Sequence, residues 1–186
     1  GTIGQRYGAT IDRYDLFKTN VLDSIKKDPY GRRKICSLWQ ETDLRETPGL
    51  APCAFMTIWN VRDGFLDMML VQRSGDMLTA SGPGGINEIQ YAALLMMTAA
   101  DTGLTPGIFT HIVANEHIYD RHINAAYEML RRYDEFYPEG SQVKSPNPSL
   151  FLNTDRTSNF YEFTIDDFTM FAYNSIKPQL TLELGI

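Results

Sequence analysis

The chain has 186 residues, 43% of them hydrophobic and 22% charged, which suits a single domain with a buried core over residues 1–186. Its formal net charge of −6 argues against a protein that binds nucleic acid through a broad basic surface. The sequence has neither an apolar run near the roughly 18 to 20 residues of a membrane span nor a signal-peptide layout. We therefore expect a cytoplasmic protein without a membrane or nucleic-acid partner.

The first half of the chain predicts a helix followed by a strand. Residues 14–27 carry apolar side chains at helical spacing, and this helix should end at Asp28, because a residue before proline disfavours the helical region. Residues 33–39 are typical of a strand, and 40–49 of a polar connection. The basic segment KKDPYGRRK between the helix and the strand is suited to a small anion.

Two long strands are predicted next, over residues 53–61 and 64–74, joined by a turn at Asp63 and Gly64. If the turn has two residues, Cys53 faces Ser74 on the second strand. If it is a three-residue turn with a bulge, Cys53 faces Arg73 instead. Either register places the segment QRS beside the thiol.

The second half predicts a glycine-rich loop over 79–87, a buried helix over 87–101, a strand over 107–119, a helix over 120–133 and a further strand over 161–168. Strands and helices alternate without repeats. The sum is an α+β fold, with a mixed β-sheet packed against helices.

The two cysteines, Cys36 and Cys53, lie in different segments and match no zinc spacing, so we expect free thiols and no metal site. An arginine beside a cysteine favours the thiolate, which is the nucleophilic form of the side chain. Cys53 is therefore a candidate nucleophile. The alternative is an inert cysteine of the core.

Five segments, in order, carry a family resemblance: DPYGRRKICSLWQ, LAPC, QRSGD, INEIQYAALLMM and HIYDRH. From about Ile3 to the last residue, the chain resembles the folate-dependent thymidylate synthases and the related pyrimidine hydroxymethylases. The resemblance implies a thymidylate-synthase-like fold in which one face of the sheet forms a homodimer interface. It also implies a methyltransferase that converts dUMP to dTMP by reductive methylation, with 5,10-methylenetetrahydrofolate as co-substrate and without a metal.

By resemblance, Cys53 is the nucleophile that adds to carbon 6 of dUMP, so that carbon 5 can attack the one-carbon unit of the folate. Arg73 resembles the arginine that contacts both the thiolate and the phosphate, and Ser74 its phosphate-binding neighbour. Arg32 and Arg33 resemble the pair that crosses an obligate homodimer to hold the partner's phosphate. By itself, the charged cluster could equally be a solvated turn.

The remaining nucleotide contacts also follow from the resemblance. Asn87 resembles the asparagine that reads the pyrimidine edge, where an amide can accept from uracil N3–H and donate to O4. By itself, Asn87 could be a helix N-cap. His117 and Tyr119 resemble the pair that binds the 3′-hydroxyl of the sugar, although such a pair on a strand can be purely structural.

Three more residues receive roles from the resemblance. Tyr7 matches a tyrosine that helps to move the carbon 5 proton, with ordinary packing as the alternative. Asp76 resembles the aspartate that binds the pterin ring of the folate, although it could also be a turn residue. Ile186, in the C-terminal segment that folds over the folate, would act as a lid.

The chain also departs from the family pattern. Ala54 and Ile58 replace a usual histidine and glutamine, Gln90 replaces a usual serine, and the loop between Asp76 and Asn87 is longer. The family's N-terminal segment has no counterpart here, so we expect the chain to be part of a longer protein. Two alternatives therefore stay open, a dUMP hydroxymethylase and a non-catalytic nucleotide-binding homodimer.

Overall fold

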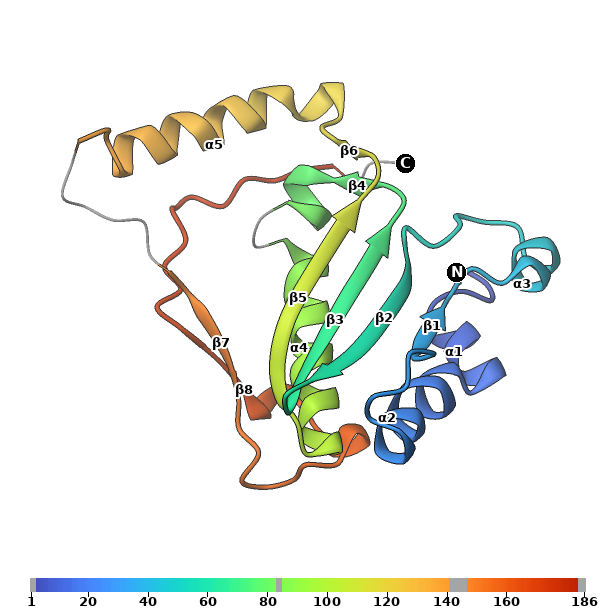
Figure 1. Cartoon of the computed structure of the whole chain (residues 1–186). Coiled ribbons are helices and arrows are strands. Elements are labelled where there is room, and N and C mark those ends of the chain that lie inside the picture. The colour runs from blue at the N-terminus through green and yellow to red at the C-terminus, as the bar shows by residue number, and fades with distance from the viewer. Residues whose placement is uncertain (1–2, 83–84, 141–146, 184–186) are drawn as a thin grey trace.

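A four-stranded mixed sheet forms the centre of the molecule in the computed structural model, which describes residues 3–82, 85–140 and 147–183 (Figure 1). Its strands, in spatial order, are β1 (Ile35–Ser37), β2 (Ala54–Arg62), β3 (Phe65–Gln72) and β5 (Thr105–Val113). Neighbours are antiparallel except β3 and β5, which are parallel and are connected through helix α4 (Ile86–Thr102). The expected α+β fold with a mixed sheet is confirmed.

Two small strand pairs accompany the sheet. They are β4 (Gly75–Asp76) with β6 (Glu116–His117), and β7 (Ser149–Leu152) with β8 (Phe168–Phe171). The other helical elements are α1 (Gly8–Tyr14), η1 (Lys18–Asp23), α2 (Ser24–Lys27), α3 (Glu41–Glu46), η2 (Met77–Ser81), η3 (Asp120–His122), α5 (Ile123–Phe136), η4 (Phe160–Glu162) and η5 (Ile165–Asp167). No helix among these described segments is long and apolar enough to cross a membrane.

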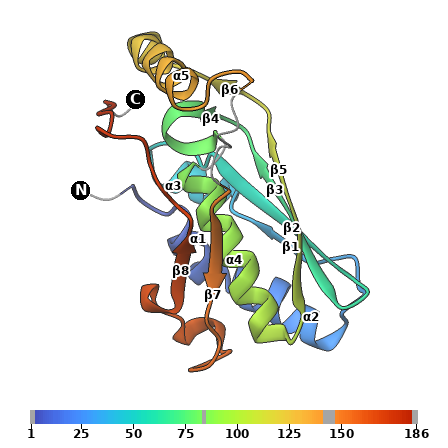
Figure 2. The same cartoon turned by 90° about the vertical axis from the view of Figure 1, so that its left-hand side faces the viewer.

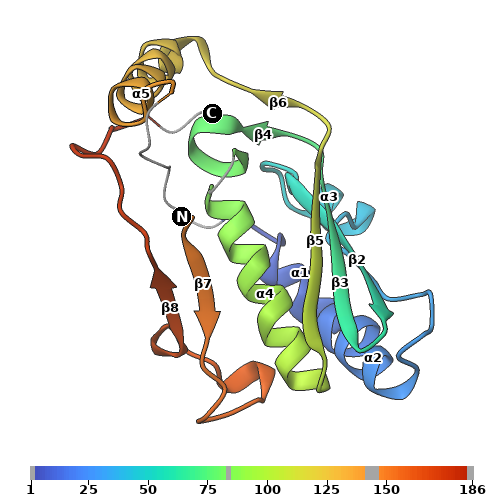
Figure 3. The ribbon, with the colours of Figure 1, turned by 60° about the vertical axis from the view of Figure 1, so that its left-hand side comes forward.

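One face of the sheet is covered and the other is open. Helix α4 lies against the covered face, and the β7–β8 pair lies on the far side of α4 (Figures 2 and 3). Trp59, Leu66 and Leu70 are fully buried on the covered face. The side chains of Ile35 and Ile112 remain 39% and 44% exposed.

The β2–β3 hairpin turns at Asp63 and Gly64 as predicted, and of the two turn lengths left open it has the two-residue one, with these residues at φ of +50° and +81°. The pairing runs regularly from Arg62 with Phe65 and then shifts at a bulge between Ala54 and Met56. As a result the Arg73 amide donates to the Cys53 carbonyl (N···O 2.9 Å). The two-residue register that pairs Cys53 with Ser74 is therefore wrong, because it did not allow for a bulge inside the strand.

The segment 14–27 is helical from residue 16 to residue 27, with η1 as a π-helical stretch in its middle, and it ends before Asp28 as predicted. The polar connection over 40–49 instead contains the helix α3. Asp43 of α3 is buried and accepts hydrogen bonds from Thr10, Arg13 and Tyr14. These long-range partners stabilise a helix whose own sequence carries little apolar periodicity.

The predicted strand over 161–168 is wrong. Residues 160–162 and 165–167 form the short helices η4 and η5, and β8 begins only at Phe168. Asn159 caps η4 by accepting from the Tyr161 amide, and Thr164 forms a capping box with Asp167 at η5. These local side-chain hydrogen bonds compete successfully with the extended backbone that was predicted for this segment.

Candidate active site

Most of the predicted site residues gather at one end of the sheet. Because β3 and β5 are parallel, both end there, and the antiparallel β2 begins there. The β4–β6 pair extends this end and sets Asp76 beside His117. Helix α4 also begins at this end (Figure 3), and Asn87 lies in the first turn of this helix.

The thiol of Cys53 is held against a fixed guanidinium. Arg73 Nη2 lies 3.6 Å from Cys53 Sγ and also donates to the Ala51 carbonyl at 2.8 Å. Arg73 Nε donates to the Pro52 carbonyl at 3.0 Å. Two backbone acceptors therefore orient the guanidinium, whose positive charge stabilises negative charge on the sulfur. Cys53 is partly exposed, whereas Cys36 is buried, and burial raises the pKa of the Cys36 thiol to about 11.

Tyr7 is brought to the same place from the start of α1. Its hydroxyl oxygen accepts a hydrogen bond from the Cys53 amide (N···O 3.0 Å), which leaves the hydroxyl proton free to be donated elsewhere. Tyr7 has φ of +49° and ψ of −115°, a conformation that is strained for a residue with a side chain. The packing around Cys53 therefore holds the phenol at some energetic cost.

Asn87 is not a helix N-cap. The cap position of α4 is Gly85, and Asn87 is the second residue of the helix. Its Nδ2 donates to Gln72 Oε1 at 3.1 Å, and His111 Nε2 lies 3.1 Å from the same oxygen. Gln72 and His111 were missed from the sequence. A signal was present, because the alternation of each strand places both polar residues in the row of apolar side chains, with Leu70 two residues before Gln72 and Phe109 two residues before His111.

His117 and Tyr119 lie together, with ring centroids 4.9 Å apart in an edge-to-face arrangement. His117 Nδ1 is 3.0 Å from Asn115 Oδ1, and the Arg121 guanidinium lies 5.1 Å from the Tyr119 ring centroid. These contacts orient both rings. Within residues 3–82, 85–140 and 147–183, the hydrogen bonds of His117 are made by Nδ1 and not by Nε2, and the Tyr119 hydroxyl makes none. The two residues that were expected to contact the sugar are thus placed as one unit.

Asp76 has a local structural role. Its carboxylate accepts from the Leu78 amide at 3.2 Å and from Thr79 Oγ1 at 2.6 Å, which caps η2. His122 Nδ1 lies 3.9 Å from Asp76 Oδ2, and neither ring nitrogen of the buried His122 has a hydrogen-bond partner among the described residues. A carboxylate has about four acceptor positions, so Asp76 keeps capacity for a ligand.

A large cavity lies beside the residues that follow Asp76. Its volume is about 910 Å³, and it runs between α5 and the C-terminal segment. Met77 and Leu78, which follow Asp76 directly, line it on one side, and Ile176 and Leu182 line it on the other. Ile186 itself lies outside the described residues. Within the described residues no group of three or more His, Cys, Asp or Glu side chains could hold a metal ion.

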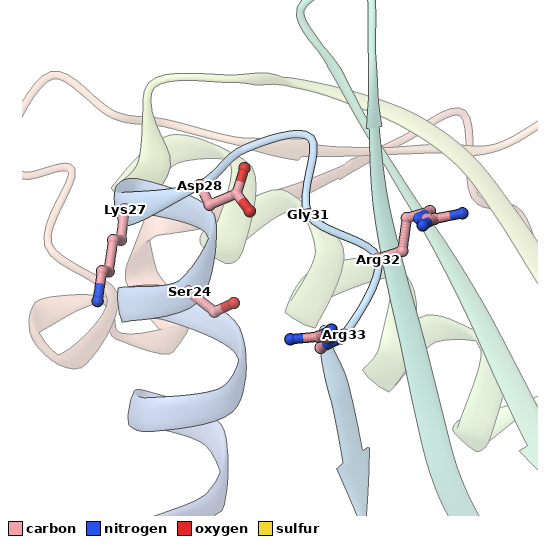
Figure 4. Close-up of a pocket in the computed structure, with 6 residues that line it drawn as sticks. All are labelled: Ser24, Lys27, Asp28, Gly31, Arg32 and Arg33. Carbon is pink, nitrogen blue, oxygen red and sulfur yellow. The ribbon is translucent and has the colours of Figure 1, made fainter.

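Arg32 and Arg33 are not brought to Cys53. They line a separate pocket of about 460 Å³ next to α2, in which their side chains point in different directions (Figure 4). The Trp59 amide donates to the Lys34 carbonyl, so this loop meets β2 near Trp59. Trp59 lies six positions along the chain from Cys53, which spans about 20 Å of extended backbone. Within one chain, Arg32 and Arg33 therefore lie on a part of the surface that is remote from Cys53.

Comparison with known proteins adds family evidence to this geometry. The family model described as thymidylate synthase matches residues 1–185. Thymidylate synthase of Lactococcus lactis subsp. lactis is 42% identical over 191 residues, and that of Streptococcus sanguinis is 40% identical over 190. Both alignments cover all of this chain, but only 64% and 63% of the relatives. The chain therefore spans about 64% of the length of the curated relatives it matches.

A solved structure is also similar. The thermostable thymidylate synthase A from Bacillus subtilis superposes with a TM-score of 0.74 at 30% sequence identity, covering 97% of this chain and 63% of that one. The similarity at this TM-score extends through nearly all of the chain. The names of these relatives do not favour the hydroxymethylase or the non-catalytic alternative.

Proposed function

Because the chain belongs to the thymidylate synthase family, we propose that it methylates dUMP to dTMP with 5,10-methylenetetrahydrofolate as co-substrate. The observation that carries the proposal is the 3.6 Å contact between Arg73 Nη2 and Cys53 Sγ. It combines a partly exposed thiol with a cation that favours its nucleophilic form. In this proposal residues 1–186 act as one catalytic domain.

The Cys53 sulfur would form a bond to carbon 6 of the uracil ring. The electron pair of the ring double bond then moves toward carbon 5 and O4, and carbon 5 becomes a nucleophile for the methylene carbon of the folate, whose bond to a folate nitrogen breaks. After the carbon 5 proton is lost, a hydride from the folate co-substrate would reduce the transferred methylene to a methyl group, and the bond between the sulfur and carbon 6 would break. Tyr7 is placed to assist the later loss of the carbon 5 proton, since its hydroxyl is anchored by the Cys53 amide. Arg73 would stabilise the negative charge that develops on the sulfur when the bond to carbon 6 breaks.

The nucleotide would be held by groups at the same end of the sheet. Arg73 and Ser74 would contact the phosphate, since a guanidinium offers forked donors to phosphate oxygens. Asn87 would read the uracil edge, with Oδ1 accepting from N3–H. His117 and Tyr119 would hydrogen-bond to the 3′-hydroxyl, which their shared edge-to-face packing supports.

The folate would occupy the cavity beside Asp76. This cavity is lined by apolar side chains such as Met77, Leu78 and Tyr133, which suit the faces of an extended aromatic co-substrate. Asp76 would accept from the pterin N–H groups with its remaining lone pairs. The C-terminal segment already lines this cavity as far as Leu182, which supports a closing role for the residues up to Ile186.

We further propose an obligate homodimer. Arg32 and Arg33 are about 20 Å along β2 from the Cys53 of their own chain, so they can serve a phosphate only in the site of a partner. The open face of the sheet would form the interface. Cross-strand pairing places Ile35, Ile58 and Met69 in one row on this face, and Val71 with Ile112 in the next.

The proposal is tested by intact mass spectrometry of the chain after incubation with 5-fluoro-dUMP and methylenetetrahydrofolate. A mass increase equal to both molecules is expected for the unmodified chain and for the control variant Cys36→Ser. Cys53→Ser should show none while still binding dUMP in calorimetry. Loss of the adduct in Cys36→Ser, or its persistence in Cys53→Ser, would contradict the assigned nucleophile.

A further inference from the structure

The segment that follows β8, residues 173–183, forms one wall of the large cavity without being part of a helix or strand. It passes from β8 toward α5 (Figure 2), and side chains from Tyr173 to Leu182 line the cavity. Within the described part of the chain, this segment takes part in one hydrogen bond, which Arg132 Nη1 of α5 donates to the Pro178 carbonyl. Ordering such a segment costs conformational entropy at every residue, so its position depends strongly on that contact.

Arg132 is oriented for this contact by an ion pair within α5. Its Nε donates to Glu128 Oε1 at 2.7 Å, one helical turn earlier. Arg131 holds the other carboxylate oxygen, since its Nε donates to Glu128 Oε2 at 2.8 Å. The Arg132 side chain is only 13% exposed, so water competes little for its donors. Because the guanidinium is planar, fixing Nε against Glu128 also fixes the direction in which Nη1 points.

Apolar packing across the cavity does little to hold its two walls together. No residue of α5 is buried. Met129, Leu130 and Tyr133, which line the cavity from α5, remain 45%, 61% and 50% exposed. Side chains that stay this exposed leave space between the walls instead of closing it. The polar contact between α5 and the C-terminal segment therefore determines how far apart the walls lie.

From this geometry we propose that Arg132 is a positioning residue that holds residues 173–182 against α5, so that both walls of the cavity are in place before a ligand enters. The inference rests on the proposed function, in which this cavity takes the folate. A site with ordered walls loses less conformational entropy when it binds, and it therefore binds more tightly. The guanidinium stays protonated at any ordinary pH, so the donor to Pro178 is always available.

Arg132 lines the cavity itself, so the competing role is direct attraction of an anionic part of the folate. The two roles predict different dependence on the ligand. A positioning role affects every ligand that needs both walls, with or without carboxylates. A direct role affects only those ligands that carry the carboxylates of the glutamate tail.

The first test measures dissociation constants by calorimetry, with dUMP present, for tetrahydrofolate and for tetrahydropteroate, which lacks the glutamate. Arg132→Met should weaken both about tenfold, as expected for the loss of one charge-assisted hydrogen bond. Arg132→Lys should recover part of the affinity, because an ammonium can still donate to the Pro178 carbonyl. Arg131→Met is the matched control, since it removes the same charge from the same helix without a contact to residues 173–183, and it should change neither constant.

Equal affinity of Arg132→Met and the unmodified chain for both ligands would overturn the inference. A loss confined to tetrahydrofolate would also overturn it, because Arg132 would then bind the glutamate directly. The affinity for dUMP alone should be the same in all four proteins.

A second measurement needs no ligand. Nitrogen-15 relaxation of the backbone amides should give order parameters of about 0.85 for residues 173–182 in the unmodified chain and in Arg131→Met, and below about 0.6 in Arg132→Met. Amides of the central sheet report in the same spectra that each variant is folded. Identical order parameters in Arg132→Met and the unmodified chain would reject the role of Arg132. If no protein bound dUMP or a folate, the proposed function would fail, and the relaxation data would still decide whether Arg132 holds this segment.

Discussion

Arg73 and Cys53 meet across the open end of the β2–β3 hairpin, with the guanidinium Nη2 3.6 Å from the sulfur. The bulge near Phe55 makes this possible, since it shifts the pairing by one residue and sets the Arg73 amide against the Cys53 carbonyl. The carbonyls of Ala51 and Pro52 then hold the guanidinium beside the thiol. The environment of the Cys53 thiol is thus built by one irregularity in an otherwise regular ladder.

The two cysteines should differ sharply in alkylation. Cys53 is partly exposed beside a cation, whereas Cys36 is buried and its pKa is raised to about 11. Under native conditions iodoacetamide should therefore label Cys53 alone, and Arg73→Gln should slow that labelling about tenfold, because the thiolate loses its cation. Peptide mapping after timed quenching measures both rates, with Cys36 as the internal control. Equal labelling of the two thiols would refute this difference.

Mixing two inactive variants should restore activity if the arginines serve a partner. Cys53→Ser and Arg33→Ala would each lose turnover as homodimers, but a mixed dimer has one site with an intact cysteine and an intact partner arginine. With random exchange of equal amounts, about a quarter of all sites should recover. The measurement is dTMP formation after subunit exchange. A mixture that stays inactive although mass spectrometry detects mixed dimers would show that Arg33 acts within its own chain.

The ion pair between Asp167 and Arg156 should make stability fall in acid. The Arg156 guanidinium, followed by the Thr164 amide, lowers the pKa of Asp167 from 3.8 to about 2. A lowered folded-state pKa contributes stability at pH values above 3.8, and that contribution is lost as the pH falls toward 2. Asp167→Asn should therefore be less stable than the unmodified chain at pH 6, and the difference should shrink between pH 4 and pH 2. Urea unfolding across this range measures it, and a difference that grows in acid would contradict the assignment.

A side chain at Gly64 should weaken the hairpin turn. Its φ of +81° lies in the left-handed region, so Gly64→Ala should destabilise the fold by about 1 kcal/mol even though a Cβ would meet no atom within 4 Å. Gly8→Ala is the matched control, because Gly8 is equally unobstructed but has an ordinary φ within α1. Urea unfolding of both variants compares them. Equal stability losses would show that strain at the turn is not the cause.

The amino-acid pattern alone predicted much of the secondary structure. The spacing of apolar residues predicted α4 and α5, and Asp63 with Gly64 predicted the hairpin turn. These features are local, because a helical face or a tight turn depends on residues close in sequence. The ordered motifs predicted the family, which the comparisons confirm. The same local reasoning failed for residues 161–168, where capping hydrogen bonds stabilise short helices in place of the predicted strand.

Other features depended on contacts between distant segments. The bulge that sets Arg73 opposite Cys53, the Tyr7 hydroxyl beneath the Cys53 amide, and the separation of Arg33 from that site all arise from the packed sheet. The buried position of Gln72 is explained only by its contacts with Asn87 on α4 and His111 on β5.

The sequence by itself determined which chemical groups the chain carries, their order, and the local elements that bear them, since these follow from short-range sterics and the spacing of apolar residues. The tertiary structure decided which of those groups meet. Register, bulges and buried hydrogen bonds join residues tens of positions apart, and their free energies depend on the complete packing.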